Sequence, residues 1–222
     1  MRKRICTFIS LAFLLFCGCA KRGAPPGGPP DIMPPKVIAT MPADGDTLVP
    51  TDATITIQFD EPIRSDANTV LLYPPLDDIS MRFGRRSVEI FHKTRLANST
   101  TYTLILTPQF SDRHNNRIGK PFQMAFSTGQ AIDTLQVSGY VLDGTLLMTA
   151  QDALVAAYSD SLMSTKPLRI TFASSGGEFR MNNMPYKTVW LFAGTGMGTQ
   201  TDWDRAAKIA VPAKATPLPA TN

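Results

Sequence analysis

Ile55-Thr56-Ile57-Gln58-Phe59 is the stretch of the 222-residue chain that decides the fold, because its apolar and polar residues alternate one by one. Successive side chains of a β-strand point to opposite faces, so this alternation predicts a strand with one apolar face and one solvated face. Asp60-Glu61-Pro62 follows directly. Pro62 has no N–H group to donate to a sheet, so the strand is expected to end there.

The alternation recurs along the rest of the chain, and turn-forming residues separate the runs. Further runs are Ile79–Phe83, Val88–His92, Tyr102–Leu106, Phe122–Phe126, Leu135–Val141, Ala153–Tyr158, Leu168–Phe172, Phe179–Met181 and Val189–Ala193. Turns are expected at Ala43–Asp46, Asp112–Asn116, Asp143–Gly144, Ser174–Gly177 and Asn182–Asn183. No stretch combines a 3.6-residue repeat with helix caps. The predicted fold class is all-β, with half-buried strands in two antiparallel β-sandwich domains, residues 35–129 and 133–211.

The first residues have the pattern of an export signal. Arg2, Lys3 and Arg4 precede an apolar run from Ile5 to Phe16, which is short for a membrane span. Phe16-Cys17-Gly18-Cys19 then resembles a lipobox, the motif at which a bacterial lipoprotein signal is cleaved. The resemblance implies a signal peptide over residues 1–18, cleavage between Gly18 and Cys19, and acylation of Cys19, with palmitate among the acyl groups. The alternative is an ordinary signal peptide whose cysteines are small apolar residues of its core.

Residues 19–34 are so rich in Pro and Gly that they are expected to form an extended, hydrated tether. Residues 212–222 are rich in Ala, Thr and Pro and are predicted to be a disordered tail. By resemblance to sorting in diderm bacteria, Ala20 after the modified cysteine favours the outer membrane. The expected partner at this end is membrane lipid, held through acylated Cys19, with the periplasmic or outward-facing side left open.

Charge and cysteine placement narrow the class of protein. The formal net charge is +4, and removing the three cations of the signal leaves about +1, which is too little for a nucleic-acid binder. Cys6, Cys17 and Cys19 all lie in the first nineteen residues. No disulfide framework and no cysteine-based metal site is therefore expected in the mature domains.

Residues 35–129 resemble a known family. Pro34 to Val37, Met41 to Gly45, Ile55 to Ile63, Thr101 to Leu104 and Lys120 to Gly129 resemble, in order and spacing, the bacterial Ig-like domain of the SbsA type, found in S-layer and cell-surface proteins. The resemblance implies an Ig-like sandwich. Residues 133–211 resemble more loosely the prealbumin-like sandwich of carboxypeptidase-regulatory domains, through Val137–Asp143, Ala153–Tyr158, Ser175–Phe179 and Trp190–Ala193. That resemblance implies an accessory domain without catalytic residues.

Few residues are candidates for binding a ligand or for catalysis. Asp112, His114, Asn115 and Asn116 lie in one loop and are weak candidates for calcium ligands, but a turn with a positive φ at Asn115-Asn116 is the favoured interpretation. Trp203 is a weak candidate for a sugar-stacking platform, against the favoured interpretation of half-buried packing. His92, one of two histidines, is interpreted as a strand-end residue, and no phosphate loop, HExxH or CxxC motif occurs. No cofactor is expected.

Three functions remain open at this level. The preferred one is a non-catalytic, lipid-anchored protein of the cell envelope that presents Ig-like modules for structural, adhesive or assembly contacts with a protein or glycan partner. The second is a glycan-binding accessory protein, for which Trp190, Trp203 and Tyr186 would have to share one face. The third is an envelope hydrolase using Asp60-Glu61 or Asp202 and Asp204 as paired carboxylates.

Overall fold

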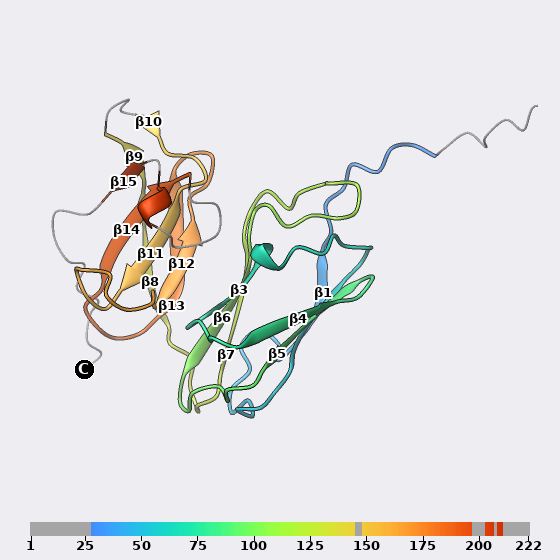
Figure 1. Cartoon of the computed structure of the whole chain (residues 1–222), viewed down its shortest axis with the longest axis horizontal. Helices are drawn as coiled ribbons and strands as arrows, with labels where there is room; N and C mark the ends of the chain where they lie inside the picture. The colour runs from blue at the N-terminus through green and yellow to red at the C-terminus, as the bar shows by residue number, and fades with distance from the viewer. Residues whose placement is uncertain (1–27, 145–147, 197–202, 207, 211–222) are drawn as a thin grey trace, which may run out of the picture. The chain divides into compact units, whose positions relative to one another are not determined.

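The computed structural model describes residues 28–144, 148–196, 203–206 and 208–210 (Figure 1). The chain divides into two units, Met1–Asp31 and Ile32–Asn222, and every described strand lies in the second. Among the described residues the only helices are two short 3₁₀ turns, η1 (Ala67–Thr69) and η2 (Trp203–Arg205), so the fold is all-β as predicted. None of the described helices is long and apolar enough to cross a bilayer.

The first sandwich is built from two antiparallel sheets, with strand orders β1-β2-β5-β4 and β3-β6-β7. Its strands are β1 (Val37–Met41), β2 (Ile55–Phe59), β3 (Val70–Tyr73), β4 (Ile79–Phe83), β5 (Ser87–His92), β6 (Thr101–Leu106) and β7 (Phe122–Ser127). Ile55, Ile57 and Phe59 are buried between the sheets, while Thr56 and Gln58 are not. The one-by-one alternation of β2 therefore places its apolar face in the core, as its sequence predicts.

The facing sheet supplies the other half of this core through Tyr102, Leu104 and Leu106 of β6. The hydroxyl group of Tyr102 accepts a hydrogen bond from the backbone N–H of Ala97 at 2.9 Å, so this buried polar atom has a partner. Phe59 stacks on Phe110, with ring centroids 4.9 Å apart. These contacts join β2 to β6 and to the loop that follows β6.

The second sandwich also consists of two sheets, with strand orders β12-β11-β14-β15 and β13-β8, and β9 pairs with β10 beside them. The strands are β8 (Leu135–Tyr140), β9 (Leu142–Asp143), β10 (Met148–Thr149), β11 (Leu154–Tyr158), β12 (Arg169–Phe172), β13 (Glu178–Met184), β14 (Trp190–Thr195) and β15 (Lys208–Ala210). Val137, Phe179 and Met181 of one sheet pack against Val155 and Ala193 of the other.

A third apolar cluster contains residues of both sandwiches. Tyr73 and Ile105 pack with residues of β11, β12 and β14, among them Leu154, Ile170 and Phe172. As a result all six residues of β6 are buried. The expectation of a half-buried strand at Tyr102–Leu106 is wrong, because the face of β6 that a lone sandwich would expose to water is covered by the second sandwich.

Most of the expected turns are found, although Asp143 of the turn expected at Asp143-Gly144 is the last residue of β9. Gly45 has φ +91° and Asn115 has φ +68°, the left-handed conformation expected in their turns. The turn expected at Asn182-Asn183 is wrong, because both residues lie inside β13. Asn183 has φ +56°, and the register of β13 against β8 shifts between Met181 and Met184. Asn183, a residue type that is common in turns, therefore lies in a β-bulge.

Candidate functional site

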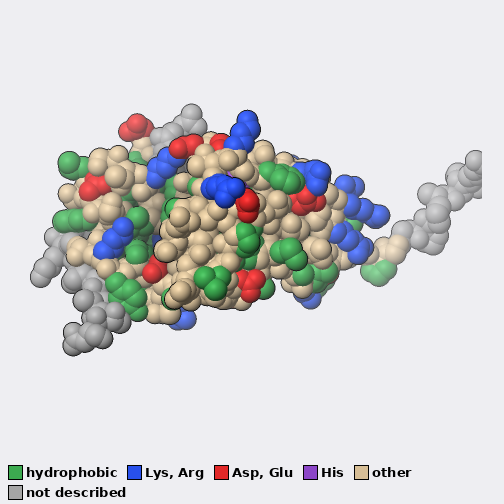
Figure 2. Space-filling model, turned by 90° about the horizontal axis from the view of Figure 1, so that it is seen from below, with side chains coloured by type: hydrophobic (Ala, Val, Ile, Leu, Met, Phe, Trp, Pro, Cys, Tyr) green, Lys and Arg blue, Asp and Glu red, His purple; other side chains and the backbone are tan. Residues whose placement is uncertain are grey.

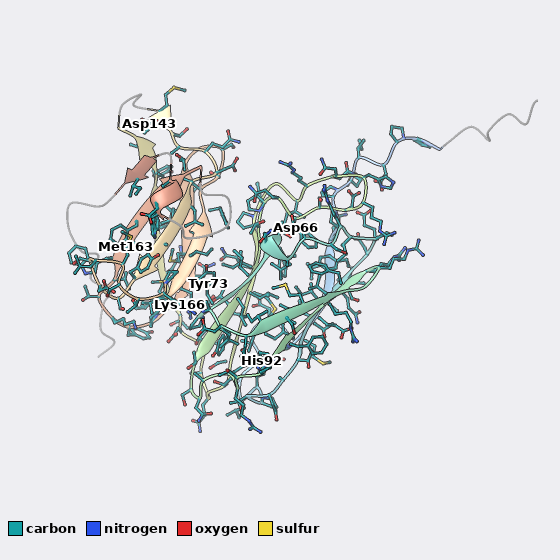
Figure 3. All side chains as sticks on the ribbon, in the orientation of Figure 1. Asp66, Tyr73, His92, Asp143, Met163 and Lys166 are labelled. Carbon is teal, nitrogen blue, oxygen red and sulfur yellow. The ribbon has the colours of Figure 1, made fainter. Side chains whose placement is uncertain are left out.

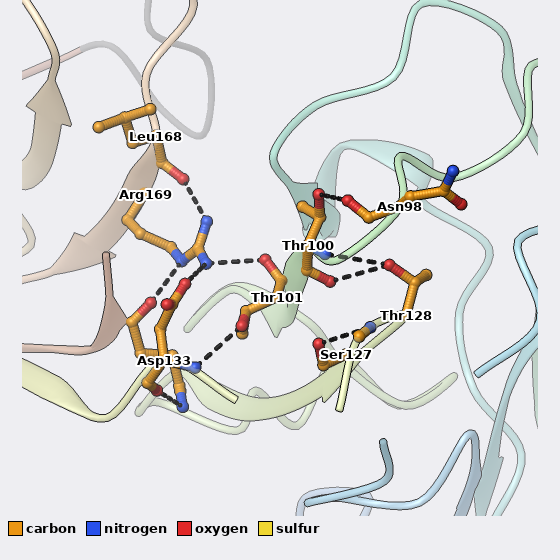
Figure 4. Close-up of polar contacts among 10 residues, drawn as sticks. Asn98, Thr100, Thr101, Ser127, Thr128, Asp133, Leu168 and Arg169 are labelled. Carbon is orange, nitrogen blue, oxygen red and sulfur yellow. Dashed lines mark hydrogen bonds and ion pairs between the residues drawn. The ribbon is translucent and has the colours of Figure 1, made fainter. Parts of the chain in front are cut away.

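Arg169, at the start of β12, is a buried polar residue that contacts both sandwiches. Only 4% of this residue is exposed, and its guanidinium donates three hydrogen bonds to backbone carbonyl groups (Figure 4). The acceptors are the carbonyl oxygens of Leu168 at 2.7 Å, Thr101 at 2.8 Å and Asn183 at 3.2 Å. Thr101 belongs to β6 of the first sandwich, so Arg169 bridges the two sandwiches.

Asp133, between the sandwiches in sequence, completes this network. Its carboxylate lies 3.8 Å from the Arg169 guanidinium, and its backbone N–H donates to the hydroxyl of Thr101 at 2.9 Å. The side-chain amide of Asn183 donates to the Asp133 carbonyl at 3.0 Å. Burial lowers the pKa of Arg169 to about 10, against the charges of Asp133 and Tyr102, which raise it. We call Thr101, Asp133, Arg169 and Asn183 the junction network.

Several aromatic residues belong to the apolar cluster around Tyr73 and Ile105 or pack against it. Burial, and then the neighbouring Tyr158, raise the pKa of the Tyr73 hydroxyl well above its usual range. Trp203 donates from its indole N–H to the hydroxyl of Tyr158 at 2.8 Å, and its ring lies 6.0 Å from that of Phe192. Trp203 therefore packs on this cluster, in agreement with the interpretation favoured from sequence, and Trp190 packs on the same cluster. Tyr186, in contrast, is exposed.

A groove lies beside the junction network, between the loop that precedes β7 and strands β12 and β13. It consists of two hollows of about 510 Å³ and 380 Å³ that share Gln123 and Asn182 in their walls. Gln123 donates to the hydroxyl of Thr171 at 3.1 Å across the groove. Further amides line it at Gln136, Gln151 and Asn183. Charged residues line it as well, namely Asp44, Lys120, Asp152, Glu178 and Arg180, so the walls offer hydrogen-bond donors and acceptors together with charges of both signs.

The loop suggested as a calcium site is a closed turn. Asp112 is fully buried, and its two carboxylate oxygens accept hydrogen bonds from the backbone N–H of Asn116 at 2.7 Å and from its side-chain amide at 2.9 Å. The side chain of Asn115 accepts a hydrogen bond from Arg64, and His114 lies 3.6 Å from Asp112. These contacts support the interpretation as a turn, since the only carboxylate among the four candidates is already engaged inside the loop.

The other candidate groups hold structural contacts or lie outside the described residues. The Asp60 carboxylate accepts a hydrogen bond from the backbone N–H of Lys36 at 2.8 Å. The two ring nitrogens of His92, labelled in Figure 3 at the end of β5, lie 2.8 Å and 2.9 Å from the carbonyl oxygens of Thr94 and Ala53. Asp204 is exposed. Gly18, Cys19 and Asp202 are outside the described residues.

Sequence reasoning missed the junction network and the groove. Arg169 gave no signal, because it alternates with Leu168 and Ile170 in a period-two run, a pattern that predicts an arginine facing water. Gln123 and Asn182 gave none either, because exposed amides are common on any sandwich.

Comparison with known proteins supports the first sandwich. The sequence profile of the bacterial Ig-like domain family matches residues 31–128, so this segment is a bacterial Ig-like domain, as its motifs indicate. No curated protein matches the chain by sequence. An L,D-transpeptidase from Mycobacterium smegmatis is 12% identical with a TM-score of 0.33, over 71% of this chain and 76% of its own. The N-terminal part of the bacterial S-layer protein SbsC is 9% identical with a TM-score of 0.31, over 77% of this chain and 43% of its own.

Proposed function

We propose that this chain is a non-catalytic lipoprotein of the bacterial cell envelope, anchored through acylated Cys19, that presents two joined β-sandwiches for contacts with other envelope components. The bacterial Ig-like match over residues 31–128 supports the envelope assignment. The lipobox-like Phe16 to Cys19 and the Pro/Gly-rich residues 19–34 support the anchor and its tether. The acylated cysteine carries more than one acyl chain in this proposal, which stable anchoring requires.

The junction network is the observation that carries the presenting role. A protein that displays a surface for assembly needs its modules held in one arrangement. Arg169 and the apolar cluster around Tyr73 and Ile105 join the sandwiches by contacts that are buried rather than exposed to water. The groove beside the network, lined by Gln123 and Asn182, is the candidate contact surface.

The two alternative functions have less support. A glycan platform would need exposed aromatic rings, whereas Trp190 and Trp203 pack against the apolar cluster around Tyr73 and Ile105. A hydrolase would need two carboxylates across a cleft, whereas the Asp60 carboxylate accepts a backbone hydrogen bond at a strand end.

Replacement of the anchoring cysteine tests the proposal. A Cys19→Ser chain, expressed in a diderm bacterium, is expected to lose incorporation of a palmitate analogue and to leave the membrane fraction, because serine has no thiol to acylate. Cys17→Ser is the matched control and is expected to retain both properties. Membrane attachment of Cys19→Ser equal to that of the unaltered protein would contradict the proposal, as would equal loss of labelling in both variants. Fractionation of inner and outer membranes then identifies the membrane.

A further inference from the structure

Three loops are connected by hydrogen bonds at the end of the first sandwich where the chain enters β1. The loops are residues 60–66, 84–86 and 111–118. The bonds that join them to each other and to the start of β1 run from Asp60 N–H to Lys36 carbonyl at 3.1 Å, from Ile63 N–H to Arg85 carbonyl at 3.0 Å, from Phe59 N–H to Arg86 carbonyl at 2.9 Å, and from Arg64 N–H to Ser111 carbonyl at 3.0 Å. This end of the sandwich is therefore one continuous surface made of segments far apart in sequence.

Exposed cations concentrate on this surface, which we call the basic end. Its six cationic residues are all exposed, and each of the three loops and the start of β1 supplies at least one. They are Lys36, Arg64, Arg85, Arg86, Arg113 and Arg117. Figure 2 shows Lys and Arg side chains gathered at the right of the view, around the end where the chain enters the sandwich. Arg85 and Arg86 are neighbours at the tip of the β4–β5 turn.

Acidic residues at the same end do not cancel this charge. Asp60, Glu61, Asp66 and Asp112 lie in the same loops, and Asp31 directly precedes Ile32, so six positive and five negative charges leave a net +1. Three of the five carboxylates accept hydrogen bonds from backbone N–H groups: Asp60 from Lys36, Asp66 from Asn68 and Asp112 from Asn116. Asp112 is also fully buried. With Asp112 buried, the six exposed cations face four acidic residues that are at least partly exposed, so the surface keeps a net positive charge.

Apolar side chains accompany the cations. Ile32 and Met33, which lead into β1, are 74% and 55% exposed. Exposed apolar groups beside Lys and Arg are the combination that favours the boundary between water and an anionic bilayer, where the apolar groups enter the acyl region and the cations meet phosphate.

We propose that the basic end docks on anionic phospholipid headgroups and forms a second, electrostatic contact with the membrane that holds the anchor. This inference rests on the proposed lipid anchor for its geometry. Twelve residues lie between Cys19 and Ile32, which makes thirteen steps from one Cα to the next. At no more than about 3.5 Å per residue they span at most roughly 45 Å, so the anchored sandwich stays within reach of the bilayer. Docking would then set which face of the two sandwiches is turned away from the membrane.

The test uses residues 20–222 without an acyl chain, which retain every described strand and all three apolar clusters. Vesicles of phosphatidylcholine with 30% phosphatidylglycerol, taken as roughly the charge of an anionic bilayer, are expected to co-sediment the protein, whereas pure phosphatidylcholine vesicles are not. Arg85→Glu/Arg86→Glu is expected to weaken binding at least tenfold, and raising the ionic strength is expected to release the protein, because exposed charges are screened by salt.

The matched control is Lys93→Glu/Arg95→Glu, which makes the same change in net charge just beyond the other end of β5. This control is expected to bind the anionic vesicles within twofold of the unaltered chain. Equal weakening in both double variants, equal binding to neutral vesicles, or no binding to either vesicle would each overturn the proposal. Binding to duplex DNA as tight as to vesicles would also overturn it in favour of a general polyanion surface. Because no acyl chain is present, these outcomes are independent of the Cys19→Ser result.

Discussion

Arg169 shows how one residue can hold two domains together. Its guanidinium is desolvated, which costs free energy, and three carbonyl groups and Asp133 offset that cost. The carbonyl oxygen of Thr101 is the acceptor contributed by the first sandwich. A lysine has the charge but presents its donors from a single point, so it cannot reach three separate carbonyl groups in the geometry of a guanidinium.

Arg169→Met is predicted to lower the free energy of unfolding by about 2–4 kcal/mol, because the methionine fills much of the volume but leaves three buried carbonyl groups without this donor. Urea denaturation followed by tryptophan fluorescence measures the change. Arg180→Met removes an exposed arginine from the adjacent strand β13 and is expected to change stability by less than about 0.5 kcal/mol. An equal free energy of unfolding for Arg169→Met and the unaltered protein would show that the junction network does not stabilise the fold.

At the scale of an element, β6 is the strand that the junction changes most. Leu104 points into the core of the first sandwich, and Ile105, one residue later, points into the cluster shared with β11 and β12. Successive residues of a strand face opposite sides, so both can be buried only if both faces of the sheet are covered. The strand is buried on both faces although its sheet is antiparallel, an arrangement in which one face is commonly solvated.

Ile105→Ala is predicted to destabilise the protein by about 2–4 kcal/mol, a loss like that of Leu104→Ala, because both substitutions leave a cavity in a packed apolar cluster. Chemical denaturation of the two variants measures both losses. Ile38→Ala, at an exposed position of β1, serves as the control and is expected to cost less than about 0.5 kcal/mol. A loss for Ile105→Ala as small as for Ile38→Ala would mean that water reaches the outer face of β6.

Most of the strands can be predicted from the sequence, whereas the contacts between the two sandwiches cannot. The alternation at Ile55–Phe59 and Phe122–Phe126 predicts its strands because period-two burial is a local property. Thr101-Tyr102-Thr103 alternates in the same way, yet both faces are buried, because the covering residues lie some fifty to ninety positions away in sequence. Asn182-Asn183 is a pair of residues typical of turns, but it lies at a β-bulge in the pairing of β13 with β8. Contacts between residues far apart in sequence therefore determine the features that local sequence patterns do not predict.

At the scale of the whole molecule, the two sandwiches share a core as well as a linker. Tyr73 and Ile105 come from the first sandwich and Leu154, Ile170 and Phe172 from the second, and all five are buried in one cluster. If either sandwich unfolded alone, it would expose its partner's half of this cluster to water. Each side would also lose its hydrogen bonds to Arg169 or Thr101. Partial unfolding is therefore penalised by the loss of both apolar burial and buried hydrogen bonds.

Residues 20–222 are predicted to unfold in a single thermal transition whose calorimetric and van't Hoff enthalpies agree, the mark of a two-state process. Scanning calorimetry measures both enthalpies on one sample. In Arg169→Met/Ile105→Ala the coupling is weakened on its polar and apolar sides at once, so two transitions are expected, with a van't Hoff enthalpy below the calorimetric one. Leu104→Ala, which lowers stability within the first core alone, sets the shift expected without loss of coupling. Two transitions in the unaltered chain would mean that the sandwiches unfold independently despite the junction between them.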